Sequence, residues 1–236
     1  MELSIIIPTL DEDKNIGFLI PYLKSQLQQN NYEIIVVDAG SSDKTREIAD
    51  NLEVEVVNCN KMSRAHQMNE GAKLAKGDIL YFVHADVKPP EHFFESIKSA
   101  LSKGYEIGCF RFKFDSNNLL LAINSYFTRF ESIVFRGGDQ TLFITKQAFE
   151  MLDGFSSEFR IMEEYDFILR AKKKYHFKIL PKDVLVSARK YKENSYLRVN
   201  FANFVVFSLF RRGASQKRML AAYRYLLKHP KEKSLK

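Results

Sequence analysis

Short apolar runs alternate with segments of helical periodicity through the first 115 residues, and this alternation restricts the fold more than any other feature. The runs are rich in Ile and Val, which is typical of strands buried on both faces. They span residues 3–9, 33–39, 54–59 and 79–83, and the helical segments span residues 16–27, 43–52, 63–75 and 90–101. This order predicts a parallel sheet with helices on both faces. Ligands bind at the carboxyl ends of such strands, where Thr9, Asp38 and Asp86 stand.

The second half of the chain is less regular. Strands are expected at residues 106–115, 141–145, 177–180 and 184–189, and helices at residues 119–132, 163–175, 195–210 and 214–229. The sequence has no internal repeat, low-complexity segment or clear linker. We therefore expect an α/β fold, a Rossmann-like, mostly parallel sheet flanked by helices. One domain would span residues 1–190, with a basic helical tail, residues 191–236, packed on it.

Charge is distributed unevenly along the chain. The net charge is +7, yet residues 1–100 hold 10 Lys/Arg against 16 Asp/Glu, whereas residues 189–236 hold 13 basic and 2 acidic residues. Such a tail is typical of a protein with an anionic partner, and a solvated basic surface would explain it equally well. With two Cys and no CxxC, a zinc site is not expected. We expect no signal peptide, because the N-terminus leads directly into a predicted strand without a basic leader. We also expect no membrane-spanning helix, because the longest apolar run, Phe201–Phe210, is too short to cross a bilayer.

Two polar segments follow the first two predicted strands. PTLDEDKN, residues 8–15, contains Pro8, Thr9 and Glu12, and its backbone could hold a base or ribose; a plain strand-to-helix loop is the alternative. VVDAGSSDKT, residues 36–45, places Asp38 and Asp43 where they could accept hydrogen bonds from a nucleoside, although Ser42 or Asp43 could simply cap a helix. Neither GxGxxG nor GxxxxGK[ST] occurs, which disfavours dinucleotide-binding proteins and ATPases.

Arg64 and Asp86 have the chemistry of a diphosphate site. Arg64 and Gln67 stand early in the predicted helix SRAHQMNEGA, and an arginine beside strand ends is a natural diphosphate ligand. Asp86 in HADVKPP ends a strand and can hold a divalent cation when a diphosphate supplies the remaining ligands, with His84 as a second candidate ligand.

Two further motifs offer acceptor and base residues. GGDQ, residues 137–140, contains two glycines that would permit close approach of a ligand or form a tight turn. In IMEEYDFILRAKK, the acids Glu163, Glu164 and Asp166 begin a helix, as the helix dipole favours. One such carboxylate is the base that a hydroxyl nucleophile needs.

Together, over residues 3–190, these motifs resemble the family 2 glycosyltransferases of GT-A fold. SIIIPTLDE, VVDAGSSDKT, RAHQMN, HAD, GGDQ and MEE occur in the family's order, and the chain is most similar to the small bacterial branch known as "transferase 2, radical-SAM/selenodomain-associated". The resemblance implies a nucleotide pocket, a metal-binding carboxylate, a base and an acceptor site. It assigns these roles to Pro8, Thr9, Glu12, Asp38, Asp43, Arg64 and Gln67 for the nucleotide, Asp86 with His84 for the metal, Glu164 with Glu163 for the base, and Gly138, Asp139 and Gln140 for the acceptor.

The sequence departs from the family's pattern at three places. His84 replaces the first acid of the DxD motif, Glu163-Glu164 replaces the Glu-Asp pair, and residues 187–191 (SARKY) stand where a Trp-containing motif is usual.

The resemblance predicts an inverting glycosyltransferase. Its cofactor would be Mg²⁺ or Mn²⁺, its donor a nucleoside-diphosphate sugar and its acceptor the hydroxyl of a lipid or small molecule. The tail would reach an anionic membrane and no nucleic acid, at a cytoplasmic, peripheral location on the inner face of the membrane. A nucleotidyltransferase and a non-catalytic nucleotide- or membrane-binding protein are the alternatives.

Overall fold

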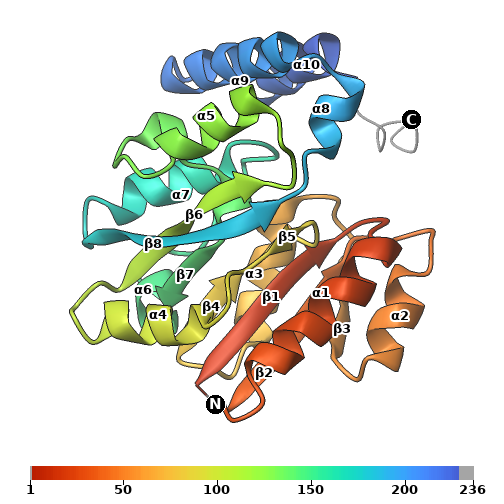
Figure 1. The fold of residues 1–236 in the computed structure, drawn as a ribbon, viewed down its shortest axis with the longest axis vertical. Coiled ribbons are helices and arrows are strands. Elements are labelled where there is room, and N and C mark those ends of the chain that lie inside the picture. The colour runs from red at the N-terminus through yellow and green to blue at the C-terminus, as the bar shows by residue number, and fades with distance from the viewer. Residues whose placement is uncertain (1, 229–236) are drawn as a thin grey trace.

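Eight strands form one sheet with helices on both of its faces (Figure 1). The computed structural model describes residues 2–228. The strand order is β3-β2-β1-β4-β7-β6-β8-β5. The strands are β1 Leu3–Thr9, β2 Tyr32–Asp38, β3 Glu55–Asn58, β4 Ile79–Phe82, β5 Val87–Lys88, β6 Ile107–Phe114, β7 Leu142–Thr145 and β8 Phe177–Val186. The predicted α/β fold is confirmed.

Four neighbouring strands, β3, β2, β1 and β4, are parallel to one another. All seven residues of β1 are buried, which explains why this segment is apolar on both faces. The register pairs Thr9 with Asp38, the last residues of β1 and β2. These two residues therefore leave the sheet side by side, at the rim where the sequence places a ligand.

The helices complete the layers on either face of the sheet. They are α1 Asp13–Gln26, α2 Thr45–Asn51, α3 Arg64–Leu74, α4 Phe93–Leu101, α5 Leu119–Phe127, α6 Lys146–Glu150, α7 Glu163–Ala171, α8 Arg189–Glu193, α9 Tyr196–Arg211 and α10 Gln216–Leu226, with short 3-10 turns at Ile133–Phe135 and Gly138–Gln140. One core contains residues of α1, α2 and α4, and the other contains residues of α3, α6 and α7. Gly71 lets α3 lie directly on β1, because a Cβ there would lie 2.5 Å from Ile6.

The second half of the sheet is not parallel throughout. β7 runs antiparallel to both β4 and β6, and β5 runs antiparallel to β8. The two strands expected at residues 177–180 and 184–189 are one strand, β8, which pairs with β6 along its length. An irregularity in the register opposite Phe110 and Arg111 absorbs the extra residues around Pro181. The apolar runs alone did not reveal that the strand continues through this bulge.

Two helices are shorter than their patterns predicted. The helix expected at residues 119–132 ends at Phe127, because the buried Arg136 side chain binds the carbonyl oxygens of Thr128 and Phe130 and turns the chain. The helix expected at residues 163–175 ends at Ala171. α6 and α8 were not expected, and both are only five residues long.

α9 and α10 pack against each other at one end of the molecule (Figure 1). The ring of Tyr191 lies 5.3 Å from that of Phe114 in β6, so the segment after β8 contacts the sheet. The domain boundary at residue 190 stays a prediction. The helix expected at residues 214–229 is α10, which ends at Leu226 because the backbone becomes extended at Leu227; residue 229 itself lies outside the described residues. Within residues 2–228 no helix is long and apolar enough to cross a bilayer.

Candidate active site

The loops that follow β1 and β2 are joined by hydrogen bonds. Asp11 accepts from the backbone N–H of Ser42 at 2.8 Å, and the N–H of Asp13 donates to the Asp43 carboxylate at 3.1 Å. Although partial burial raises the pKa of Asp43, hydrogen bonds from Thr45 and Asp13 outweigh it and lower that pKa. The two loops therefore form one ordered wall at the rim of the sheet.

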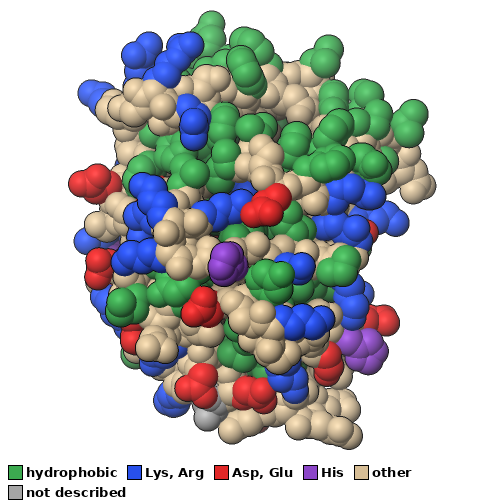
Figure 2. Space-filling model, turned by 90° about the vertical axis from the view of Figure 1, so that its left-hand side faces the viewer, with side chains coloured by type: hydrophobic (Ala, Val, Ile, Leu, Met, Phe, Trp, Pro, Cys, Tyr) green, Lys and Arg blue, Asp and Glu red, His purple; other side chains and the backbone are tan. Residues whose placement is uncertain are grey.

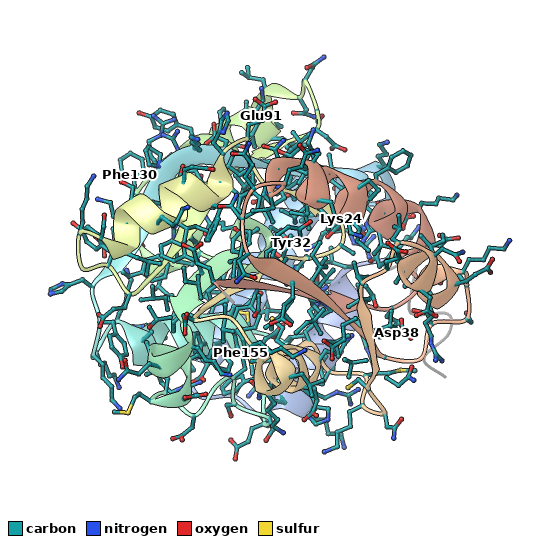
Figure 3. All side chains as sticks on the ribbon, turned by 90° about the horizontal axis from the view of Figure 1, so that it is seen from below. Lys24, Tyr32, Asp38, Glu91, Phe130 and Phe155 are labelled. Atoms are coloured by element: carbon teal, nitrogen blue, oxygen red, sulfur yellow. The ribbon has the colours of Figure 1, made fainter. Side chains whose placement is uncertain are left out.

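Asp38 orders this wall from within. Its side chain is fully buried, and its carboxylate accepts hydrogen bonds from the N–H groups of Gly40 and Ser41 at 3.0 and 2.9 Å and from the Thr9 and Ser41 hydroxyls. Figure 3 labels Tyr32 and Asp38, the two ends of β2. Pro8 is buried beside Thr9. The carboxylate thus faces its own loop, and its predicted contact with a nucleoside stays a prediction.

The Gln67 side chain also binds backbone groups of the protein. Its amide donates to the carbonyl oxygens of Thr9 and Val37 at 2.8 and 2.7 Å, and its side chain is buried. It therefore links α3 to the ends of β1 and β2. The sequence placed Gln67 toward a base or diphosphate, but here its NH₂ group is engaged with carbonyls.

Arg64, the first residue of α3, is exposed at this rim. It forms no ion pair within 4.0 Å among the described residues, yet four carboxylates surround it: Glu163, Glu164, Asp86 and Asp139. Although part of the Arg64 side chain is exposed, desolvation by the surrounding protein lowers its pKa, and these acids, Glu163 foremost, outweigh that effect and raise it. Arg64 is therefore a fixed positive charge that can bind an anionic ligand.

Arg189 joins this group from a distant part of the chain. Its guanidinium lies 3.0 Å from an Asp86 carboxylate oxygen and donates to both Glu12 oxygens at 3.1 and 3.3 Å. The backbone N–H of Ser187 donates to the carbonyl of Asp86 at 3.3 Å, which holds the end of β8 beside the start of β5. Arg189 was not among the predicted site residues. Its position in the SARKY motif, where the family has a different motif, was the feature of the sequence that could have indicated a role.

His84 and Glu164 form a close pair in the floor of the site. His84 Nε2 lies 3.0 Å from Glu164 Oε1, and both side chains are nearly buried. Burial alone lowers the pKa of His84, but the Glu164 carboxylate outweighs it and raises that pKa. The imidazole that was predicted as a metal ligand thus lies against the carboxylate that was predicted as the base, close enough for a charge interaction but without a well-aligned hydrogen bond.

The acids of α7 occupy three different environments. Burial, followed by the charge of Glu164, raises the pKa of Glu163 to about 7. Asp166 accepts from Arg170 at 2.8 Å, and Arg170 also binds the carbonyls of Leu152 and Gly154, so Asp166 has a structural role. Of the three acids, Glu164 is the one that lies beside His84, and its predicted role as the base stays a prediction.

The GGDQ turn borders the same cluster. Asp139 is exposed and lies near enough to Asp86, His84 and Arg64 to interact with their charges. The Gln140 side chain is 1% exposed, and neither its amide nitrogen nor its amide oxygen has a hydrogen-bond partner among the described residues. An unpaired buried amide costs about 1–3 kcal/mol, which a ligand or water at this turn would recover.

A divalent cation fits this site only as part of a diphosphate complex. Among residues 2–228 no three His, Cys, Asp or Glu side chains gather into a metal site. Asp86 supplies one hard oxygen ligand, now paired with Arg189, and His84 is paired with Glu164. Mg²⁺ is commonly held by one or two carboxylates plus substrate phosphates, so Asp86 suits it when a diphosphate is present.

Hollows on the surface of residues 2–228 include one beside Asp86 and one away from the predicted site residues. One, of about 360 Å³, includes Asp86 and Ser187 in its lining. The other, of about 620 Å³, lies over Met151–Glu158 and contains none of the predicted site residues. Arg64 and Asp86 lie near enough for their charges to interact, whereas the Asp38 carboxylate is turned to its own loop. A common role of these residues in nucleotide binding stays a prediction.

Comparison with known proteins identifies the family. The family model described as "Glycosyl transferase family 2" matches residues 4–154, more than half of the chain. The chain belongs to glycosyl transferase family 2. The match includes β1, β2, α3, β4 and the GGDQ turn, but it ends before α7.

Two relatives act, by their names, on lipid phosphates. The dolichol-phosphate mannosyltransferase of Pyrococcus furiosus is 34% identical over 45% of this chain and 32% of its own length. The undecaprenyl-phosphate 4-deoxy-4-formamido-L-arabinose transferase of Aeromonas hydrophila is 30% identical over 44% of this chain and 35% of its own length. The matched segment is thus about a third of the length of these curated relatives.

Solved structures share the fold across nearly the whole chain. The mannosyltransferase PcManGT from Pyrobaculum calidifontis, in complex with GDP-Man and Mn²⁺, superposes with a TM-score of 0.67 at 18% identity, covering 95% of this chain and 69% of its own. S. aureus TarS 1–349 in complex with UDP-GlcNAc gives a TM-score of 0.65 at 16% identity, covering 96% and 71%. The fold is therefore that of the GT-A glycosyltransferases, as the motifs indicated.

Proposed function

We propose that this protein transfers a sugar from a nucleoside-diphosphate sugar to an acceptor hydroxyl with inversion at the anomeric carbon. The observation that carries the proposal is the cluster at the carboxyl ends of β1 and β4. There the exposed Arg64, without an ion pair among residues 2–228, faces Asp86, Glu163 and Glu164. Family membership and the structural neighbours in complex with UDP-GlcNAc and GDP-Man support it.

The donor diphosphate would lie between Arg64 and Asp86. Arg64 would bind phosphate oxygens, because a guanidinium forms strong, charge-assisted hydrogen bonds with them. Asp86 would hold Mg²⁺ or Mn²⁺, which would neutralise the charge of the leaving diphosphate. Arg189 now neutralises Asp86, so it must release this carboxylate when the cation binds.

Glu164 would act as the general base. Its carboxylate lies 3.0 Å from His84 Nε2, in the first turn of α7. A carboxylate at this place can remove the proton of an acceptor hydroxyl as that oxygen attacks the anomeric carbon. Gly138, Asp139 and Gln140 would border the acceptor, with the unpaired Gln140 amide as a hydrogen-bonding group for it.

We further propose that the protein belongs to the "radical-SAM/selenodomain-associated" branch. We also propose that it is a peripheral protein on the inner face of the membrane, with its basic tail attracted to anionic lipid. The 13 basic against 2 acidic residues of the segment 189–236 support the last point. The relatives that act on lipid phosphates support a lipid acceptor.

Calorimetric titration with UDP, GDP and dTDP, with and without Mn²⁺, tests nucleotide binding, and a transfer assay with the corresponding sugar nucleotides tests catalysis. Glu164→Gln should reduce transfer by about 10²–10⁴-fold and leave nucleotide affinity nearly unchanged. Glu158→Gln, at an exposed position outside the site, is the matched control. Full transfer by Glu164→Gln would exclude this residue as the base. Release of pyrophosphate would identify a nucleotidyltransferase instead, and nucleotide binding without turnover would favour a non-catalytic protein.

A further inference from the structure

α5 and the turn after it expose an uncharged, apolar surface. The sequence of α5, LLLAINSYF, contains no charged residue, and Leu121 is its one buried side chain. The large exposed side chains of this segment are Leu119, Leu120, Ile123, Tyr126, Phe127, Phe130 and Val134. A helix that faces water normally carries polar residues on its outer side. An apolar surface of this kind is typical of a site that binds a partner.

α9 extends the same surface. Asn124 of α5 donates to Asn200 of α9 at 3.2 Å and accepts from the Tyr196 hydroxyl at 2.7 Å, so the two helices lie side by side. On the surface of α9, Asn200 lies between Leu197 and Phe204, three residues before and four after it. Leu197, Phe201 and Phe204 are exposed. We call these three residues, together with the seven of the α5 segment, the apolar face.

The apolar face contains ten of the sixteen large hydrophobic side chains that are exposed in residues 2–228. In Figure 2, hydrophobic side chains gather over the upper part of the molecule, at the level of α9 and α5 in Figure 1, with Lys and Arg side chains beside them. Exposed apolar side chains that stand singly need no explanation, but a contiguous patch of this kind marks an interaction site.

The apolar face is held rigidly from below. The Arg136 side chain is buried and binds the carbonyls of Thr128 and Phe130 as well as the Cys109 sulfur, at 3.2 Å. Ring contacts of about 6 Å join Tyr126, Phe127 and Phe130 to one another. A buried arginine that fixes the turn indicates a preorganised surface, because a loop that merely failed to pack would lack such an anchor.

The charge next to the apolar face distinguishes two possible partners, a second copy of the chain and an anionic membrane. Residues 195–228 contain seven Lys/Arg and no Asp or Glu, and Arg129 lies over the Tyr126 ring at 3.8 Å. A second copy of the chain would bring the same positive charge to the interface and be repelled, whereas anionic phospholipid is complementary to it. We propose that the apolar face docks on an anionic membrane surface, with its aromatic and aliphatic side chains in the interfacial region.

Docking at the apolar face would also orient the candidate active site. The Tyr165 ring in α7, next to Glu164, lies 5.7 Å from Phe207 and 6.2 Å from Phe210 of α9. α7 is therefore attached to a helix that would rest on the membrane, and the base would work close to lipid headgroups. This consequence rests on the proposed sugar transfer, and the docking itself deepens the membrane location that is part of the proposed function.

Vesicle flotation of the full chain tests the docking. The probes are vesicles of phosphatidylcholine alone and of phosphatidylcholine with phosphatidylglycerol in equal parts. A triple variant, Leu119→Ser, Leu197→Ser and Phe204→Ser, changes side chains that are 74, 77 and 67% exposed, so the fold should survive, as circular dichroism can verify. Phe18→Ser, on α1 and 81% exposed, is the matched control.

We expect the wild type and Phe18→Ser to float with the anionic vesicles, and the triple variant to partition at least about tenfold more weakly. Equal partitioning of the triple variant and the wild type would overturn the proposal, as would absence of wild-type binding at low salt. A stable wild-type dimer that the triple variant abolishes would assign the apolar face to self-association instead. Nucleotide titration of the triple variant separates membrane docking from the proposed sugar transfer. The variant should bind nucleotide as the wild type does even when it no longer binds vesicles.

Discussion

Replacement of Glu163 by Gln should make the protein more stable at neutral and alkaline pH. The Glu163 side chain is 3% exposed, and burial together with the charge of Glu164 raises its pKa from 4.5 to about 7. A carboxyl whose pKa is higher in the folded than in the unfolded protein binds its proton more tightly when folded. Its contribution to stability is therefore present below pH 4.5 and is lost as the pH rises through 7.

The size of the effect follows from the same shift. A difference between 4.5 and about 7 corresponds to about 3 kcal/mol, since each pKa unit is worth 1.36 kcal/mol. Gln has a similar shape and does not ionise, so Glu163→Gln should escape this loss. The free energy of unfolding of the variant relative to the wild type should thus rise by about 3 kcal/mol between pH 4.5 and pH 8.

Urea unfolding of both proteins across this pH range measures the difference directly. Glu158→Gln, at an exposed position, serves as the control and should follow the wild type within about 0.5 kcal/mol at each pH. Parallel curves for Glu163→Gln and the wild type would refute the reasoning, because they would mean that Glu163 ionises as easily in the folded protein as in the unfolded chain.

Three further predictions concern the rim of the sheet. Arg64→Met should weaken binding of the nucleoside diphosphate by about 10–100-fold, the worth of a charged hydrogen bond, with little change in melting temperature; equal affinity in calorimetry would remove Arg64 from the diphosphate site. Gln67→Leu removes two hydrogen bonds to strand-end carbonyls and should lower the free energy of unfolding by about 2 kcal/mol in urea; no loss would contradict its linking role. Arg189→Met removes the half-exposed ion pair with Asp86, which is worth up to about 1 kcal/mol. The Mn²⁺ concentration needed for nucleotide binding should therefore fall up to about fivefold. Nucleotide binding that is unchanged when a chelator removes Mn²⁺ would argue against a cation at Asp86.

The sequence predicted the parallel half of the sheet well, for a clear physical reason. Strands β1, β2 and β4 are largely buried on both faces, so most of their residues are apolar. The apolar residues of the intervening helices recur at the spacing of one buried helix face. The antiparallel direction of β7 and the single long strand β8 could not be predicted in this way. Strand direction and a bulge depend on pairing with distant strands, and the local pattern of Phe177–Val186 records neither.

In the candidate site, the sequence indicated positions better than roles. The charges of Asp86 and Glu164 act on Arg64, because strand ends and helix starts lie at one rim, but the roles that the motifs imply for these three residues stay predictions. Asp38 and Gln67 stand at the expected places, yet their polar atoms are engaged by backbone groups and hydroxyls of the loops beside them.

The contacts of His84 and Arg189 illustrate what the sequence lacks. His84 pairs with Glu164, eighty residues away, and Arg189 pairs with Asp86, more than one hundred residues away. A motif records which residues are present near a site, but it does not record which of two neighbouring charges a side chain will face.

A crystal structure with Mn²⁺ and whichever of UDP, GDP and dTDP binds most tightly would test the central claim most directly. We predict that the diphosphate lies between the Arg64 guanidinium and the Asp86 carboxylate, with Glu164 facing the open side where an acceptor enters. A nucleotide bound away from these three side chains, or a diphosphate that contacts neither Arg64 nor Asp86, would contradict the account.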